Sequence, residues 1–364
     1  MNTTSVSLRV LLASATLSIV AGAADAEQFY RNTPLVSNGG LHARVFDRNL
    51  VNAWGIAFNP TGFAWVNSAD GNVSVLYDGS GHPSPQPQRL IVAVPGPDGS
   101  KGNPTGIVFS GGADFVVTKS GVSGPARFIF ATEQGNLAGW APNVDVNNAV
   151  FVPKGAQDTD ESVYTGLALG GNGTTHLLYA ANFRQRRIDV FDGTFTKVEL
   201  AAGRFVDKFL PSNFAPFGVQ AINGDIYVTY AKQAEGGEEE VTGPGLGYVN
   251  VFDPEGRMIR RVATRGVLNA PWGVALAPDS FRKFGGALLV GNFGDGTINA
   301  FAPRTGAFLG ALRGPDGNKL RIDGLWAIQF GNGILAQKTN ALFYAAGPND
   351  ETSGLFGVIT VAFQ

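Results

Sequence analysis

Seven polar side chains that can bind a cation or carry a proton occur at related places along the sequence. Each lies at the end of a run of apolar and β-branched residues or shortly after it: Asn67, Asp70, Glu133, Asn182, Asn292, Asp295 and Asp350. If these runs are equivalent strands of a repeated fold, the side chains form a ring. Their amide and carboxylate oxygens are the ligands that calcium prefers, so one interpretation is a calcium site. The other is that Asn and Asp cap hairpin turns here, which is their commoner role.

Three tryptophans occupy one and the same position of a recurring pattern: Trp54, Trp272 and Trp326. We expect them to pack between neighbouring repeats. A ring of aromatic side chains at the mouth of a channel can also stack on a sugar or another flat ligand, and both interpretations stay open.

Several other chemistries find no support in the sequence. His42, His82 and His176 lack the spacing of zinc ligands, and no G-x-S-x-G nucleophile elbow occurs. With no cysteine there are no disulfides and no thiol nucleophile. A net charge of −2 gives no sign of a surface for nucleic acid.

The recurring pattern itself predicts the fold. Six copies are found, and all but the last centre on a glycine: 52–58, 103–109, 163–169, 215–221, 270–276 and 324–330. From Gly55 to Ala327 the mean period is roughly 54 residues, which lies in the range of propeller blades.

Within each copy, short β-rich runs follow one another, separated by Gly, Asp, Asn or Pro. Such a unit is an antiparallel meander of four strands, and it cannot bury both faces alone. Six units arranged radially solve that problem, so we predict an all-β, six-bladed β-propeller as the single domain of residues 27–364.

Two segments of this propeller need separate predictions. The last copy ends after its third strand, so we expect residues 29–45 to supply the fourth, with 31–37 and 41–46 as the two candidates. Residues 233–247 lengthen one turn and are rich in Glu and Gly, which predicts a flexible, solvated loop.

The first 26 residues have the layout of a secretory signal peptide. Arg9 precedes the apolar run 10–23, and residues 24–26 read Ala-Asp-Ala, a cleavage pattern. We therefore expect cleavage near Ala26, a secreted or periplasmic protein, and no membrane span in the mature chain.

Several longer phrases resemble a known family: Leu50 to Phe58, Tyr179 to Phe183, Leu268 to Gly273, Leu289 to Gly296 and Ala346 to Asp350. The chain resembles exported bacterial six-bladed β-propeller proteins with NHL-like repeats over nearly all of its mature length. Some members end in a sorting tag, which this sequence lacks. The resemblance implies a fold and an export route but no agreed activity.

Two hypotheses of function follow from these observations. The first is an exported module, expected to be monomeric, that binds a small molecule or a protein. The alternative is a calcium-dependent hydrolase of the gluconolactonase type, in which a Glu, Asn, Asn, Asp set holds a metal that polarises a lactone carbonyl.

Overall fold

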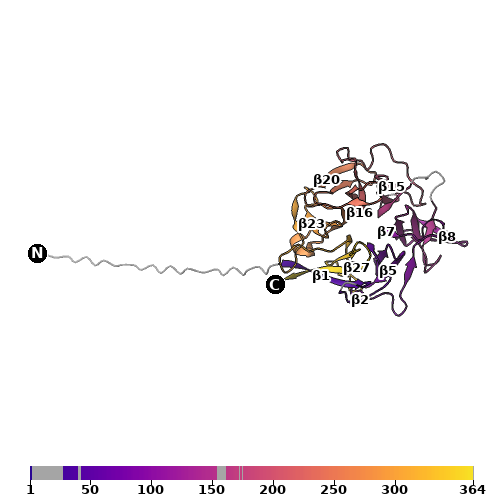
Figure 1. Ribbon diagram of the computed structural model, residues 1–364, viewed down its shortest axis with the longest axis horizontal. Helices are drawn as coiled ribbons and strands as arrows, with labels where there is room; N and C mark the ends of the chain where they lie inside the picture. The colour runs from indigo at the N-terminus through magenta and orange to yellow at the C-terminus, as the bar shows by residue number, and fades with distance from the viewer. Residues whose placement is uncertain (2–27, 40–41, 154–160, 172, 174, 364) are drawn as a thin grey trace.

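Six β-sheets surround a central axis (Figure 1). The computed structural model describes residues 1, 28–39, 42–153, 161–171, 173 and 175–363, and these are almost entirely strand, turn and loop. The first strands of successive blades contact one another around a closed ring and line the axis. The prediction of a six-bladed β-propeller is confirmed.

The blades follow the chain, each running from an inner to an outer strand. Blade one contains β3 (Ala53–Phe58), β4 (Ala64–Ser68), β5 (Val73–Tyr77) and β6 (Ile91–Ala93). Blade two contains β7 (Pro104–Phe109), β10 (Phe128–Thr132), β11 (Leu137–Trp140) and β12 (Val150–Val152). Blade three contains β13 (Tyr164–Gly171), β14 (His176–Asn182) and β15 (Arg187–Phe191).

The second half repeats the arrangement. Blade four contains β16 (Phe214–Ile222), β17 (Asp225–Gln233), β19 (Tyr248–Phe252) and β20 (Met258–Thr264). Blade five contains β21 (Pro271–Leu276), β22 (Leu288–Asn292), β23 (Ile298–Phe301) and β24 (Phe308–Ala311). Blade six contains β25 (Leu325–Phe330), β26 (Leu342–Ala346), β27 (Leu355–Phe363) and β1 (Gln28–Ser37).

A few short elements lie outside the six blades. A hairpin of β8 (Val116–Lys119) and β9 (Val122–Pro125) projects from the rim at blade two (Figure 1). The two 3-10 helices are η1 (Pro97–Gly99) and η2 (Asp279–Phe284). Of the described residues, none belongs to a helix long and apolar enough to cross a bilayer.

The ring is closed by both ends of the chain. β1 pairs antiparallel with β27, from Gln28 opposite Phe363 to Ser37 opposite Leu355. The first of the two predicted candidates, residues 31–37, therefore lies in this fourth strand. From the second candidate, only β2 (Val45–Phe46) forms a strand, and it pairs in parallel with the end of β1. This pairing covers the edge of β27 and gives blade six its fourth strand.

Blade three differs from the prediction of four strands. After β15, the described chain makes one bridge, between Phe191 and Lys197, and one further backbone hydrogen bond, from Val198 N to Val190 O. It then leaves the sheet edge, so only three strands are formed there among the described residues.

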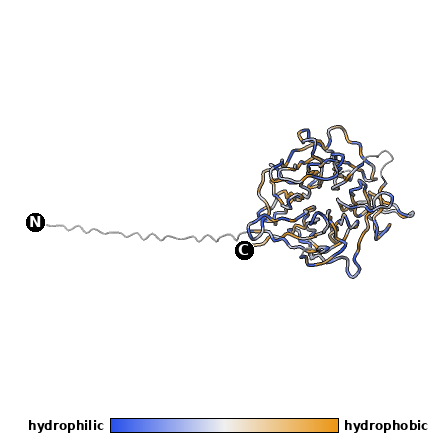
Figure 2. Tube along the Cα trace, in the orientation of Figure 1, coloured by the Kyte–Doolittle hydropathy of each residue, from blue (hydrophilic) through white to orange (hydrophobic). Residues whose placement is uncertain are grey.

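The inner strands approach each other so closely that glycine is required. A Cβ on Gly106 would lie 2.2 Å from the backbone nitrogen of Leu167, and one on Gly218 would lie 2.1 Å from the carbonyl oxygen of Trp272. Figure 2 shows hydrophobic and hydrophilic residues following one another at short intervals along the trace. The recurring glycine thus marks the place where blades meet.

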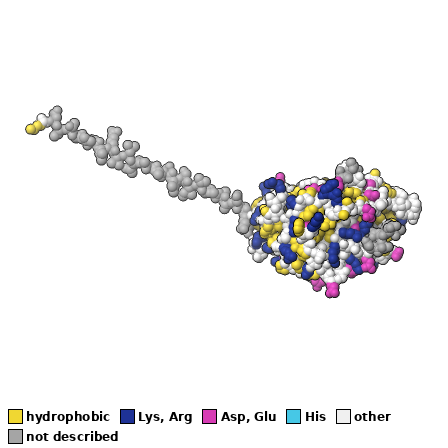
Figure 3. All heavy atoms as spheres, turned by 90° about the horizontal axis from the view of Figure 1, so that it is seen from above, with side chains coloured by type: hydrophobic (Ala, Val, Ile, Leu, Met, Phe, Trp, Pro, Cys, Tyr) yellow, Lys and Arg dark blue, Asp and Glu magenta, His cyan; other side chains and the backbone are white. Residues whose placement is uncertain are grey.

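On the side of the molecule seen in Figure 3, acidic and basic side chains are interspersed. This agrees with the small net charge of −2. The predicted signal peptide, residues 1–26, lies outside the described residues apart from Met1.

Candidate functional site

Four carboxylates from four different blades converge at one end of the central channel. Each lies in the connection that follows the second strand of its blade, and these connections share one face of a propeller. Asp70 follows β4, Glu133 follows β10, Glu351 follows β26, and Glu240 begins β18 (Glu240–Val241) after β17. We call Asp70, Glu133, Glu240 and Glu351 the acidic mouth.

The carboxylates of the acidic mouth act on one another. Removal from water, together with the negative charges of Asp70 and Glu351, raises the pKa of Glu133 to about 8. Burial raises the pKa of Glu240 to about 7, again with help from Glu351. At neutral pH the acidic mouth therefore holds protons that ordinary surface carboxyls would have lost.

Glu351 has a fixed partner. The side-chain amide of Asn52 donates a hydrogen bond of 2.6 Å from Nδ2 to Glu351 Oε2. Burial raises the pKa of Glu351 to about 7, while this hydrogen bond opposes the shift. Because the partner is neutral, it orients the carboxylate without neutralising it.

Below the acidic mouth, aromatic side chains fill the channel. Trp54 and Trp326 stack with ring centroids 3.6 Å apart, and Phe293 stacks on Trp326 at 4.1 Å. Phe217 packs against Trp326 at 5.5 Å. The indole N–H of Trp326 donates to Asn52 Oδ1 at 3.1 Å, which ties this aromatic cluster to the acidic mouth.

The insertion at residues 233–247, predicted to be a flexible, solvated loop, is exposed at Glu235, Glu238 and Glu239, but it is more regular than expected. Its first part is a paired hairpin, with Lys232 opposite Val241 and Gln233 opposite Glu240. Gln233 donates from Nε2 to the carbonyl oxygen of Phe183 and accepts a hydrogen bond from Arg186. These buried hydrogen bonds hold the hairpin beside blade three and bring Glu240 to the acidic mouth.

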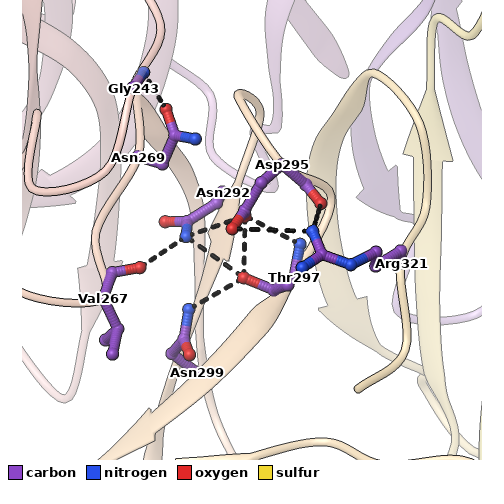
Figure 4. Close-up of polar contacts among 8 residues, drawn as sticks. All are labelled: Gly243, Val267, Asn269, Asn292, Asp295, Thr297, Asn299 and Arg321. Atoms are coloured by element: carbon purple, nitrogen blue, oxygen red, sulfur yellow. Dashed lines mark hydrogen bonds and ion pairs between the residues drawn. The ribbon is translucent and has the colours of Figure 1, made fainter. Parts of the chain in front are cut away.

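Two of the predicted site residues hold the loops that enter their own blades. Asn292 donates from Nδ2 to the carbonyl oxygen of Val267 at 2.8 Å and to Thr297 Oγ1 at 3.2 Å (Figure 4). Asn182 donates to Ser162 Oγ at 3.0 Å and to Asp189 Oδ2 at 2.8 Å. Both side chains are fully buried.

Asn67 lies one residue out of step with them. Ser68, not Asn67, pairs with Ala53 in the way that Asn292 pairs with Pro271. Adjacent residues of a strand point to opposite faces. Asn67 therefore faces blade two, where its Nδ2 donates to the carbonyl oxygen of Thr105 at 2.9 Å.

The remaining predicted residues lie in turns. Asp295 accepts hydrogen bonds from Thr297 Oγ1 at 2.8 Å and from Asn292 Nδ2 at 3.1 Å, which is turn capping (Figure 4). Asp350 is exposed and has a positive φ of 50°. The structure thus brings Asp70 and Glu133 together, with Glu351 beside Asp350, and leaves Asn67, Asn182 and Asn292 in structural hydrogen bonds.

The three tryptophans have different environments. Trp54 and Trp326 are 3% and 1% exposed, so their faces contact protein and not solvent. Trp272 is half-buried and donates from Nε1 to the carbonyl oxygen of Thr165 at 2.9 Å, a contact between blades five and three.

The described residues contain no group of three or more His, Asp or Glu side chains arranged to hold one metal ion. The carboxylates of the acidic mouth come from four separate blades. A ligand that contacts all of them must therefore span the mouth or carry its own shell of water.

Sequence reasoning missed Asn52 and Glu351. Asn52 lies three residues before the repeat glycine Gly55, as Asn103 does before Gly106, and both have positive φ, at 47° and 40°. An asparagine tolerates this conformation better than most residues. The repeated Asn could have been noticed in the sequence, but its partner on blade six could not.

Known proteins resemble the chain in sequence and in fold. It is 32% identical over 338 residues to "Uncharacterized protein L690" of Acanthamoeba polyphaga mimivirus, a match that covers 89% of this chain and 83% of the viral protein. It is 30% identical over 334 residues to "Uncharacterized protein R648" of the same virus, a match that covers 89% of this chain and 78% of the viral protein. No protein-family model matches the chain.

Three solved structures share the fold at low sequence identity. A virginiamycin B lyase from Staphylococcus aureus superposes with a TM-score of 0.53 at 12% identity, over 92% of this chain and 99% of the lyase. A glucose dehydrogenase superposes with a TM-score of 0.52 at 14% identity, over 90% of this chain and 98% of the dehydrogenase. The PQQ-bound aldose sugar dehydrogenase of Streptomyces coelicolor superposes with a TM-score of 0.50 at 14% identity, over 93% of this chain and 99% of that enzyme.

These likenesses to solved structures show the propeller fold alone, whereas the likeness to the viral proteins extends along most of both sequences. The chain therefore belongs to the same family as the mimivirus proteins L690 and R648.

Proposed function

We propose that this protein is a binding module that takes a cationic ligand at the acidic mouth. One observation carries the proposal. Among the described residues, no Arg, Lys or His forms an ion pair with Asp70, Glu133, Glu240 or Glu351, although other buried carboxylates have such partners.

The contrast with those other carboxylates is direct. Asp47 pairs with Arg89 at 3.1 Å, Asp189 pairs with Lys197 at 3.3 Å, and Asp207 pairs with Arg261. Charges removed from water without a partner repel one another and are costly. A bound cation would relieve that repulsion at the acidic mouth, and the relief would contribute to the free energy of binding.

The ligand that we favour is a small organic cation with several ammonium groups, because the four carboxylates are spread over four blades. Spermidine is a probe of this class. Calcium, with its preference for six to eight oxygen ligands, is the inorganic cation to compare.

We retain the calcium-dependent hydrolase as a second candidate because of Glu133. A carboxyl with a pKa of about 8 keeps its proton at pH 7 and is suited to act as a general acid. A lactone or ester substrate at the acidic mouth would meet both this proton and the other carboxylates.

Isothermal titration of the purified chain with spermidine, and separately with calcium chloride, tests the proposal. We expect spermidine to bind with a Kd below about 1 mM, and the double variant Glu133→Gln with Glu351→Gln to bind at least about tenfold more weakly. Glu199→Gln, which removes an exposed carboxylate on blade three, is the matched control. Binding of neither cation would refute the proposal.

Binding of calcium together with chelator-sensitive melting would favour the hydrolase, and lactone and ester substrates should then be screened. We also propose that the protein is exported and processed near Ala26. N-terminal sequencing of the protein recovered outside the cytoplasm of a bacterial host tests this, and a mature chain that keeps its first 26 residues would contradict it.

A further inference from the structure

Asn52 lies between the acidic mouth and the aromatic cluster and is held from both sides. Its side chain is 2% exposed and its φ is 47°. Its backbone nitrogen donates to the carbonyl oxygen of Ser353 at 3.1 Å, and its carbonyl oxygen accepts from Ala69 at 3.0 Å. The backbone of Asn52 is thus fixed to the loops of blades six and one independently of the contacts that its side chain makes.

The chemistry of its neighbours permits one orientation of the amide. An indole N–H can only donate, so Asn52 Oδ1 must face Trp326 Nε1, 3.1 Å away. With Oδ1 held by the indole, Nδ2 faces Glu351 Oε2, 2.6 Å away, and donates to it. A flipped amide would place its N–H donors against the indole donor.

The space around the amide is closed as well. A Cβ on Gly347 would lie 2.2 Å from Asn52 Oδ1. Only a glycine at position 347 leaves room for the Asn52 side chain where it is, so the loop of blade six and Asn52 fit one another.

We infer that Asn52 is a positioning residue of the cation site: it orients Glu351 towards the ligand and connects occupancy of the acidic mouth to the indole of Trp326. The inference rests on the proposed function. A cation on Glu351 withdraws charge from the oxygen that accepts from Asn52, and the change passes through the amide to the Trp326 hydrogen bond. Tryptophan fluorescence should therefore respond to the ligand.

Asn52→Asp separates positioning from simple charge. Asp has nearly the same size, tolerates the left-handed backbone, and keeps an oxygen towards Trp326, but it puts a second oxygen against Glu351. If charge alone governed binding, the added carboxylate would tighten the binding of spermidine. If Asn52 positions Glu351, affinity falls by about tenfold, the usual effect of losing a hydrogen bond to a charged group.

The matched comparison is Asn103→Asp. Asn103 occupies the equivalent position of blade two, also with positive φ, and donates to Asp70 Oδ1 at 3.3 Å. The Asn103→Asp variant adds the same charge to the acidic mouth without touching Trp326. We expect this variant to keep the fluorescence response to spermidine and Asn52→Asp to lose it.

Trp326→Phe serves as the second variant should Asn52→Asp not fold. This variant removes the indole donor together with part of the buried ring, and we expect spermidine still to bind while the fluorescence response disappears. The inference is overturned if Asn52→Asp binds spermidine as tightly as the unaltered chain or more tightly, or if Trp326→Phe keeps the response. An unaltered chain that binds no cation would instead refute the proposed function.

Discussion

Tyr344 donates a hydrogen bond of 2.8 Å from its hydroxyl to Asn32 Oδ1, across 312 positions of the chain. Asn32 lies on β1 and Tyr344 on β26, and β27 runs between these strands. Blade six is therefore built from both ends of the described chain, and the stability of the ring depends on a strand that precedes all other blades.

Leu35 of β1 should be essential to this closure. Its side chain is fully buried in one apolar cluster with Tyr77 and Phe356. We expect Leu35→Ala to lower the free energy of unfolding by about 2–5 kcal/mol, measured by urea denaturation. Arg31 on the same strand is exposed, and Arg31→Ala should change the free energy of unfolding by less than about 0.5 kcal/mol.

Deletion of residues 28–37 extends the same test. It should lower the melting temperature of the whole ring, because β27 would become an exposed edge. Equal melting with and without this strand would contradict the closure.

Glu133 should make stability depend on pH. Its pKa is raised from 4.5 to about 8 in the folded protein, so the folded state binds more protons than the unfolded state between these values. The contribution of the Glu133 carboxyl to the free energy of unfolding is fully present below pH 4.5 and is lost as the pH rises through 8. We expect Glu133→Gln to match the unaltered chain at pH 5 and to exceed it by roughly 1–3 kcal/mol at pH 9.

Thermal melts between pH 5 and 9 check this prediction, with Glu199→Gln as the control for loss of an exposed carboxylate. A constant difference between Glu133→Gln and the unaltered chain at all pH values would show that the Glu133 pKa is not raised.

Gln233 should hold the hairpin of residues 233–247. It is 6% exposed, and its Nε2 donates to the carbonyl oxygens of Phe183 at 2.6 Å and Gly237 at 3.2 Å. Gln233→Ala leaves these acceptors unpaired, at a cost of about 1–3 kcal/mol. Amide hydrogen exchange should speed up within the hairpin and stay unchanged in blade one. Exposed Glu235→Ala is the control, and unaltered protection in Gln233→Ala would contradict the anchor.

Asn292 should affect stability and not ligand binding. Its Nδ2 holds the carbonyl oxygen of Val267, so Asn292→Ala should lower the free energy of unfolding by about 1–3 kcal/mol. Affinity for spermidine should stay the same, because the side chain is fully buried and lies outside the acidic mouth. The exposed Asn318→Ala is the control for stability. A loss of cation affinity in Asn292→Ala would restore this residue to the binding site.

Most strands could be predicted because their limits depend on local chemistry. Apolar and β-branched runs bounded by turn residues form β26 (Leu342–Ala346) and β23 (Ile298–Phe301), as expected of the short β-rich runs in each repeat. The β8–β9 hairpin was missed, since Val116–Lys119 and Val122–Pro125 lie outside the repeated pattern.

The candidate site was predicted only in part. Asn67 and Asn292 both lie near the end of a second strand, but the strand pairing makes Ser68 the counterpart of Asn292, so Asn67 points to the other face of its blade. Contacts between strands decide which of two adjacent polar residues faces a neighbouring blade.

The number of blades, the inner strands and their glycines follow from the repeat in the sequence, because a repeat that cannot bury its own faces must pack against copies of itself. Which carboxylates meet depends on the folded ring. Asp70, Glu133, Glu240 and Glu351 lie far apart along the chain, and the angle between blades brings their loops to one mouth. It also placed Asn52 between Glu351 and Trp326, a contact that depends on the ring being closed.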